Sequence, residues 1–140
     1  MAPDLAGVFA PLTTPFAAEV SVALGDLKRN VEFYNKTGLT GYVVLGSTGE
    51  AVFLSRSEGE AVLVTVKESA APGKFLIAGA GAESTAETIE RTRRAGALGY
   101  AAALVKTPHY YKPHYTPEAL IEHYRRVADA SPVPIILYSV

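Results

Sequence analysis

The stretch Gly41-Tyr-Val-Val-Leu-Gly-Ser-Thr-Gly-Glu50 changes character halfway along its length. Its first half is an apolar, β-branched run typical of a buried strand, and its second half places two hydroxyl side chains between Gly46 and Gly49. Glycines let a backbone bend and approach a ligand closely, while Ser47 and Thr48 offer O–H and N–H donors. The stretch therefore predicts a strand that opens into a turn able to bind an anion, either a carboxylate or a phosphate.

Length and composition are those of an ordinary globular domain. The 140 residues are 49% apolar, carry a formal charge of −1 and include no cysteine. The sequence therefore offers no clustered Lys/Arg surface for a nucleic acid, and no disulfide, thiolate nucleophile or Cys-based zinc site. No apolar run reaches membrane-spanning length, and the start of the sequence lacks a basic segment followed by an apolar one. We expect a cytoplasmic protein with neither nucleic-acid nor membrane partners.

Five apolar runs recur at intervals typical of βα units. They are Val8–Pro11, Tyr42–Leu45, Phe75–Ala78, Ala102–Val105 and Ile135–Tyr138. Because these runs do not alternate with polar residues, they predict strands buried on both faces of a parallel sheet. Such a sheet belongs to an α/β fold, either a (β/α)₈ barrel or a doubly wound sheet.

Helix start signals fall between these runs. Ser55–Glu58 and Ser84–Glu87 match the capping-box pattern, and Thr116 precedes a proline suited to a first helical position. The first helix is less well marked, and its apolar face predicts a span from Leu24 to Thr37. Each expected strand before the fifth is therefore followed by a helix.

The loops after the strands favour the barrel. A doubly wound nucleotide binder usually has a glycine-rich turn after its first strand, but here that strand leads into Pro11-Leu-Thr-Thr-Pro15. Residues capable of chemistry instead follow the second, fourth and fifth strands, as in barrels. A barrel needs about 250 residues, so residues 1–140 are predicted to form the N-terminal part of one (β/α)₈ domain: four βα units and strand five. The first and fifth strands would then have open edges.

Two later stretches could contribute to the same site. Thr107-Pro-His-Tyr-Tyr-Lys-Pro113 holds three rings between prolines that stiffen the loop, and Tyr138 ends the fifth strand at the same rim. Taken singly, the loop is explained by aromatic packing and Tyr138 by a core tyrosine with a satisfied hydroxyl. The case for function rests on all three stretches together.

Together these motifs resemble the dihydrodipicolinate synthase / N-acetylneuraminate lyase family of Schiff-base pyruvate aldolases. The resemblance is carried by Gly-Ser-Thr-Gly-Glu at 46–50, Thr-Pro-x-Tyr-Tyr at 107–111 and Leu-Tyr-Ser-Val at 137–140. The segments 7–16 and 78–85 look like the same family. In places the sequence is most similar to 4-hydroxy-2-oxoglutarate aldolases. The resemblance covers the N-terminal half of such a barrel.

This resemblance implies a class I aldolase, in which a lysine amine and a 2-oxo acid such as pyruvate form an imine. The substrate carboxylate would bind Ser47 and Thr48 in the turn bounded by Gly46 and Gly49, and Tyr138 would be the general acid/base. Ser47 and Tyr110 would be the relay partners of Tyr138, since a free phenol titrates only near pH 10. The resemblance implies no cofactor and a homodimer or homotetramer when the barrel is complete.

The family's imine lysine lies on strand six, beyond Val140, so the chain is expected to lack the nucleophile and to be a truncation of a longer enzyme. Lys106, at the end of the fourth strand, is the only lysine with a route to the pocket, and we expect it to be exposed or ion-paired. Four more lysines, on helices or before strand three, are expected to be solvated: Lys28, Lys36, Lys67 and Lys74.

Three alternatives stay open. A phosphate site in the 46–50 turn predicts phosphate affinity and no response to pyruvate. A catalytically inactive half-barrel, or a partner that completes a barrel with a separate half, would use the same fold without chemistry. A metal site would have to use His109, His114 or His123, but no carboxylate pair completes a recognisable ligand set, so we expect no metal.

Overall fold

A five-stranded parallel sheet runs through the computed structural model, which describes residues 4–139. The strands are β1 Phe9–Pro11, β2 Gly41–Val44, β3 Phe75–Gly79, β4 Ala102–Lys106 and β5 Ile135–Tyr138. The helices are α1 Leu24–Tyr34, α2 Arg56–Ser69, α3 Thr85–Ala97 and α4 Pro117–Ala130, with short 3₁₀ turns η1 Ala51–Phe53 and η2 Lys112–His114. All five expected strands and the alternation with helices are thus present.

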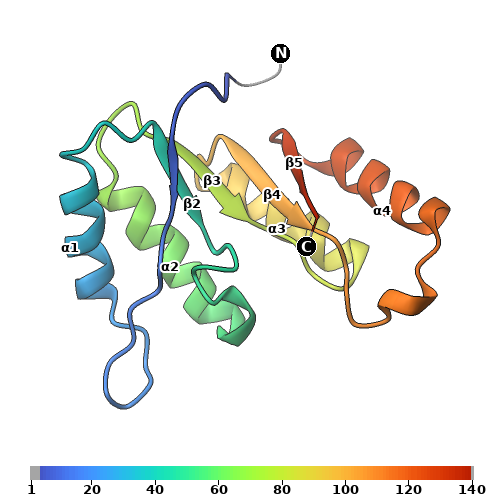
Figure 1. Cartoon of the computed structure of the whole chain (residues 1–140), viewed down its shortest axis with the longest axis horizontal. Helices are drawn as coiled ribbons and strands as arrows, with labels where there is room; N and C mark the ends of the chain where they lie inside the picture. Colours follow the sequence, from blue (N-terminus) through green and yellow to red (C-terminus); the bar gives the residue numbers. More distant parts are fainter. Residues whose placement is uncertain (1–3, 140) are drawn as a thin grey trace.

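The strands follow one another across the sheet in the order β1-β2-β3-β4-β5, and every pair is parallel (Figure 1). A doubly wound sheet reverses its strand order at a switch point, and this sheet has no reversal. Right-handed crossovers in an unreversed order place all the helices on one face, as in a barrel. The prediction that the chain forms the first βα units of a (β/α)₈ barrel is therefore confirmed, and the alternative of a doubly wound sheet is excluded.

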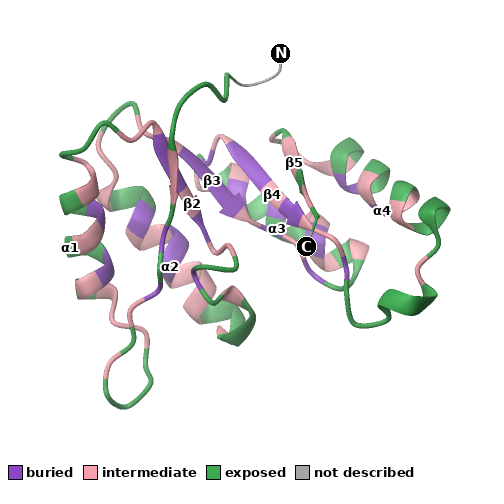
Figure 2. Ribbon diagram, in the orientation of Figure 1, coloured by how far each residue is buried: buried purple, intermediate pink, exposed green. Residues whose placement is uncertain are grey.

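The core lies between the sheet and the helices. Tyr42 and Val44 on β2 pack with Val31 of α1 and with Val62 and Val66 of α2, and all five side chains are buried (Figure 2). Burying a side chain of this size contributes roughly 1.5–3 kcal/mol, so this layer accounts for much of the stability of the fold.

The helix starts follow the capping signals closely. Ser55 and Glu58 form a complete capping box, and Thr116 accepts a hydrogen bond from the amide of Ala119. Ser84 accepts from the amide of Glu87, but the Glu87 carboxylate binds Arg91. The second predicted box is therefore formed only by its serine.

Helix α1 ends at Tyr34, before the expected Thr37. The amides of Lys36 and Thr37 bond to carbonyls three residues back, which tightens the last turn. The side chain of Asn35 also binds outside the helix, donating to the carbonyl of Ser69 at 2.8 Å. These contacts join the end of α1 to the end of α2.

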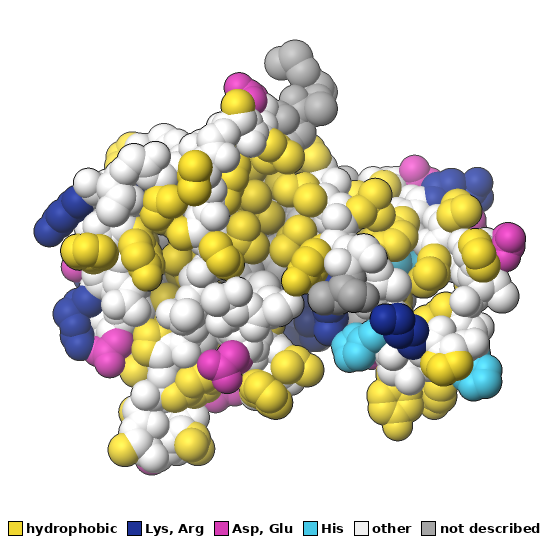
Figure 3. Space-filling view, viewed as in Figure 1, with side chains coloured by type: hydrophobic (Ala, Val, Ile, Leu, Met, Phe, Trp, Pro, Cys, Tyr) yellow, Lys and Arg dark blue, Asp and Glu magenta, His cyan; other side chains and the backbone are white. Residues whose placement is uncertain are grey.

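The outer strands β1 and β5 have open edges, as expected. The prediction that every strand is buried on both faces is wrong for these two, since Leu137 of β5 is 64% exposed. Figure 3 shows hydrophobic side chains gathered over the middle of the face in view, in the region where Figure 1 places β2 and β3. Among residues 4–139, none of the helices combines the length and apolar character required to cross a bilayer.

Candidate active site

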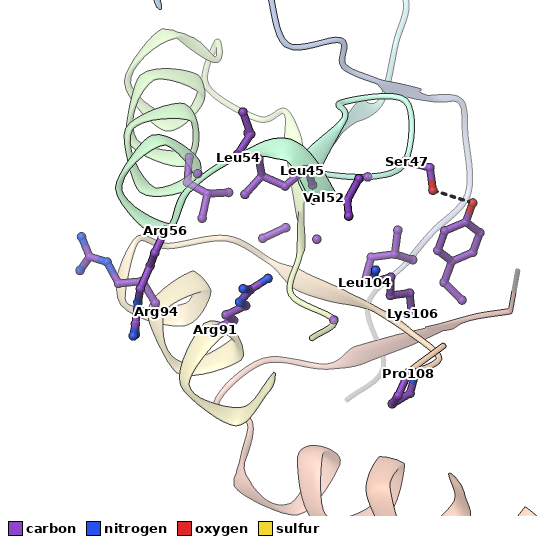
Figure 4. Close-up of a pocket in the computed structure, with 18 of the residues that line it drawn as sticks. Leu45, Ser47, Val52, Leu54, Arg56, Arg91, Arg94, Leu104, Lys106 and Pro108 are labelled. Carbon is purple, nitrogen blue, oxygen red and sulfur yellow. Dashed lines mark hydrogen bonds between the residues drawn. The ribbon is translucent and has the colours of Figure 1, made fainter. Parts of the chain in front are cut away.

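The carboxyl ends of β2 and β5 bring two of the predicted site residues into contact. The Ser47 hydroxyl, in the turn after β2, lies 3.2 Å from the hydroxyl of Tyr138, the last residue of β5. Either oxygen can be the donor, so the pair can pass a proton in either direction. Both side chains line a cavity of about 520 Å³ at this rim of the sheet (Figure 4).

The turn after β2 is bent by residues other than its glycines. Leu45 and Glu50 have left-handed backbones, with φ of 60° and 52°, whereas neither Gly46 nor Gly49 has a positive φ. The expectation that the two glycines make the bend is therefore corrected. Such conformations cost non-glycine residues about 1–2 kcal/mol and are often found at functional sites.

Gly49 is required by a close backbone approach. A Cβ atom at this position would lie 2.9 Å from the carbonyl oxygen of Leu12, whereas one at Gly46 would meet only Val43 Cγ1, at 3.6 Å. The hydroxyl of Thr14 donates to the carbonyl of Gly49 at 2.6 Å. The segment after β1, through Leu12 and Thr14, thus packs against the turn and holds it in place.

The donors that the turn offers to an anion are those of Ser47 and Thr48. The amides of Gly49 and Glu50 bond to the carbonyls of Gly46 and Ser47, at 3.1 and 3.0 Å, so they are used within the turn. Ser47 and Thr48 are both exposed. Among the described residues, Ser47 lines the cavity and Thr48 does not.

The structure does not bring Tyr110 to this pair. Tyr110 lies in the loop after β4, where its ring packs edge-on against Tyr111 with centroids 4.9 Å apart. It is 75% exposed, and within residues 4–139 no hydrogen bond joins it to Ser47 or Tyr138. Among residues 4–139, its predicted relay role has no hydrogen-bonded partner.

Lys106 lies beside Tyr138. The two residues are partners in the β4–β5 register and therefore point to the same face of the sheet. The Lys106 amine is 3.4 Å from Nδ1 of His109, and the side chain is partly exposed at the cavity. Lys74 differs from expectation, because its amine donates to the carbonyl of Leu39 at 2.6 Å and is not simply solvated.

Glu83, in the loop after β3, does not line the cavity but contacts His109, which does, and the sequence did not predict this role. Its Oε2 accepts hydrogen bonds from the amides of His109 and Tyr110, both at 3.0 Å, and its Oε1 lies 2.8 Å from His109 Nδ1. Burial raises the pKa of this carboxyl, but the two amides and the charges of His109 and Lys106 outweigh burial and lower it overall. The only signal was an acidic residue directly before the Ser84 cap.

The far end of the cavity is lined by arginines of α2 and α3, as Figure 4 shows for Arg56, Arg91 and Arg94. Arg94 pairs with Glu60, and Glu87 binds both Arg91 and Arg56. This end is therefore an ion-paired network between two helices.

The three histidines have different neighbours. His109 contacts Glu83, His114 lies in η2, and His123 is buried on α4 with Nδ1 2.9 Å from the Thr85 hydroxyl. In the part of the chain that the structure describes, no three His, Asp or Glu side chains gather as a metal site would require.

Comparison with known families supports the fold and the resemblance. The model of the dihydrodipicolinate synthetase family matches residues 4–140. A 4-hydroxy-tetrahydrodipicolinate synthase of Methanothrix thermoacetophila is 43% identical over 135 residues, covering 96% of this chain and 44% of the relative. A probable mitochondrial 4-hydroxy-2-oxoglutarate aldolase of Emericella nidulans is 37% identical over 141 residues, covering 98% and 46%.

Solved structures give the same result. A dihydrodipicolinate synthase from Acinetobacter baumannii, complexed with pyruvate, has a TM-score of 0.91 at 39% identity, covering 96% of this chain and 45% of that one. An N-acetylneuraminate lyase from Mycoplasma synoviae has a TM-score of 0.87 at 29% identity, covering 96% and 46%. The chain thus spans about half the length of its relatives.

Proposed function

Because the chain belongs to the dihydrodipicolinate synthetase family, we propose that it supplies part of a class I, pyruvate-dependent aldolase or lyase. The observation that carries this proposal is the contact of Ser47 with Tyr138, 3.2 Å apart at the carboxyl ends of two strands. Relatives include both synthases and an oxoglutarate aldolase, so the proposal is limited to making or breaking a C–C bond next to a 2-oxo acid.

The chemistry needs a proton carrier at the imine. When an amine attacks the keto carbon of pyruvate, the carbinolamine must lose water, so protons move to and from oxygen at that carbon. We assign this transfer to the Tyr138 phenol, with the Ser47 hydroxyl as its partner. The imine then takes up electrons when the bond between its neighbouring carbon and the following carbon breaks, which leaves an enamine, and the enamine returns them when that bond forms.

The substrate carboxylate is assigned to Ser47 and Thr48. Both residues are exposed, on a turn whose next two amides are already bonded internally, and Ser47 lines the cavity while Thr48 adjoins it in sequence. A carboxylate is bound well by several short donors. Gly46 and Gly49 form the turn that presents them.

Tyr110 is proposed to act in a second copy of the protein. Its ring is 75% exposed and lies away from the Ser47–Tyr138 pair of its own chain, which is the arrangement expected of a residue that completes a neighbouring site. A cytoplasmic homodimer or homotetramer is accordingly part of this proposal.

The imine lysine is proposed to lie outside residues 1–140, on a further strand of a single barrel domain. The test is intact-mass spectrometry after incubation with pyruvate and borohydride, which reduces a lysine imine to a stable adduct. We expect no adduct on the 140-residue chain and one adduct once the remaining βα units are supplied. An adduct on the chain alone, absent in Lys106→Arg, would assign the amine to Lys106. No adduct in either form would favour an inactive half-barrel.

A further inference from the structure

We propose that Glu83 is a positioning residue, whose carboxylate fixes the 107–115 loop against the end of β3 and so sets the location of Tyr110. The inference rests on the proposed function only in treating Tyr110 as a relay residue. The contact itself is a structural feature that does not depend on any reaction: it joins two loops that are distant in sequence.

We call the contact of Glu83 with His109 and Tyr110 the latch, and the single carboxylate of Glu83 makes all of it. Oε2 accepts from two successive amides, those of His109 and Tyr110, each at 3.0 Å and more than 25 positions along the chain. Oε1 lies 2.8 Å from Nδ1 of His109. Hydrogen bonds to an ionised acceptor are about twice as strong as neutral ones.

The amides of Lys112 and His114 bond within the loop, to the carbonyls of His109 and Tyr111, whereas Glu83 bonds the loop to another part of the chain. Residues 109–114 are all exposed, whereas Pro108, two residues after β4, is buried. An exposed loop of this kind is held in one conformation more firmly when its backbone amides bond to a neighbouring element. Glu83 provides that bonding for the two residues at the centre of the motif.

The imidazole of His109 faces two competing neighbours with the same nitrogen. Nδ1 is 2.8 Å from the Glu83 carboxylate and 3.4 Å from the Lys106 amine. One ring nitrogen cannot donate to the carboxylate and accept from the ammonium at once. The shorter contact favours the tautomer in which Nδ1–H donates to Glu83, so the latch includes the imidazole ring.

The latch and the Ser47–Tyr138 pair are built by different elements. Glu83 follows β3 and holds the loop after β4, whereas Ser47 follows β2 and Tyr138 ends β5. Loss of the Glu83 carboxylate should therefore free Tyr110 while leaving the carboxylate-binding turn unchanged.

The test is amide hydrogen exchange by NMR on the 140-residue chain, with Glu83→Ala, Glu83→Gln and the control Glu32→Gln, whose carboxylate pairs with Lys28 on α1. In Glu83→Ala, the amides of His109 and Tyr110 should lose at least ~10-fold in protection, the effect of removing a hydrogen bond to a charged group. Glu83→Gln keeps an acceptor oxygen and should retain part of the protection.

The pH dependence separates a charged latch from simple packing. In the wild type the protection factors should persist below pH ~4.3, the ordinary value for Glu, and fall only when the carboxyl protonates at lower pH. In Glu83→Gln they should not change over this range.

Unchanged protection in Glu83→Ala would overturn the proposal. If Glu83→Ala also loses protection throughout β2–β4, the variant is unfolding and Glu83→Gln becomes the test. A pH profile in Glu83→Gln identical to that of the wild type would then overturn the proposal. Pyruvate titration of the Ser47 and Thr48 amides, in the same samples, tests the proposed function separately. Loss of that response with an intact latch would reject the function and keep the role of Glu83.

Discussion

Gly79→Ala tests how the fold holds the turn that carries Ser47. Gly79 is the last residue of β3, and a Cβ atom there would lie 2.0 Å from the carbonyl oxygen of Leu45, where ordinary contact begins at 3.4 Å. Both groups are backbone, so no flexible side chain can move aside. The two strand ends would have to separate by about 1.4 Å, the difference between those distances.

Such overpacking costs about 1–3 kcal/mol. A Gly→Ala change also lowers the entropy of the unfolded chain, which stabilises the protein by about 0.4–1 kcal/mol, so a matched control is needed. Gly38→Ala supplies it, because a Cβ there meets nothing within 4 Å. Relative to this control, we expect Gly79→Ala to lower the free energy of unfolding by about 2 kcal/mol.

Urea denaturation of both variants measures the difference, and the amide shift of Ser47 reports whether the turn moves with Leu45. We expect a lower urea midpoint and a displaced Ser47 signal in Gly79→Ala alone. Free energies of unfolding that agree within about 0.5 kcal/mol would refute the claim that the close approach of β3 to Leu45 positions the turn.

Three further predictions follow from other contacts. Tyr138→Phe, in a completed barrel, should reduce kcat by about 10²–10⁴-fold with little change in pyruvate affinity, because only the proton carrier is lost. Steady-state kinetics measure both quantities, and an unchanged kcat would show that Tyr138 is not the general acid/base. Thr48→Val should weaken pyruvate binding by about tenfold through loss of one donor to a carboxylate, measured as KM for pyruvate. Burial holds the pKa of His123 below its usual value, so the unfolded state binds more protons than the folded state below pH ~6.5. The free energy of unfolding should therefore fall from pH 7 to pH 5, as measured by urea titrations, and His123→Gln should remove this contribution to the slope.

Local signals in the sequence predicted much of the fold. The apolar runs located all five strands within a residue or so, and Ser55, Glu58 and Thr116 marked helix starts because a capping side chain bonds to amides three residues away. The end of α1 was predicted three residues too late, because neither the tightened turn at Lys36 and Thr37 nor the bond of Asn35 to Ser69 of another helix has a local sequence signal.

The site was predicted in part for the same reason. Ser47 and Tyr138 come together because both follow parallel strands, which end at one rim. The left-handed backbones of Leu45 and Glu50 have no signal in residue type, since such conformations usually favour glycine. Glu83 was not foreseen, because its partners are main-chain amides, which every sequence position offers equally.

The most direct test of the central claim is an NMR titration of the 140-residue chain with pyruvate, with inorganic phosphate as a parallel titrant. A carboxylate site predicts saturable shifts of the Ser47 and Thr48 amides with pyruvate, weakened in Thr48→Val, and none of this kind with phosphate. Saturable shifts with phosphate alone, or pyruvate shifts confined to the arginines of α2 and α3, would contradict the account.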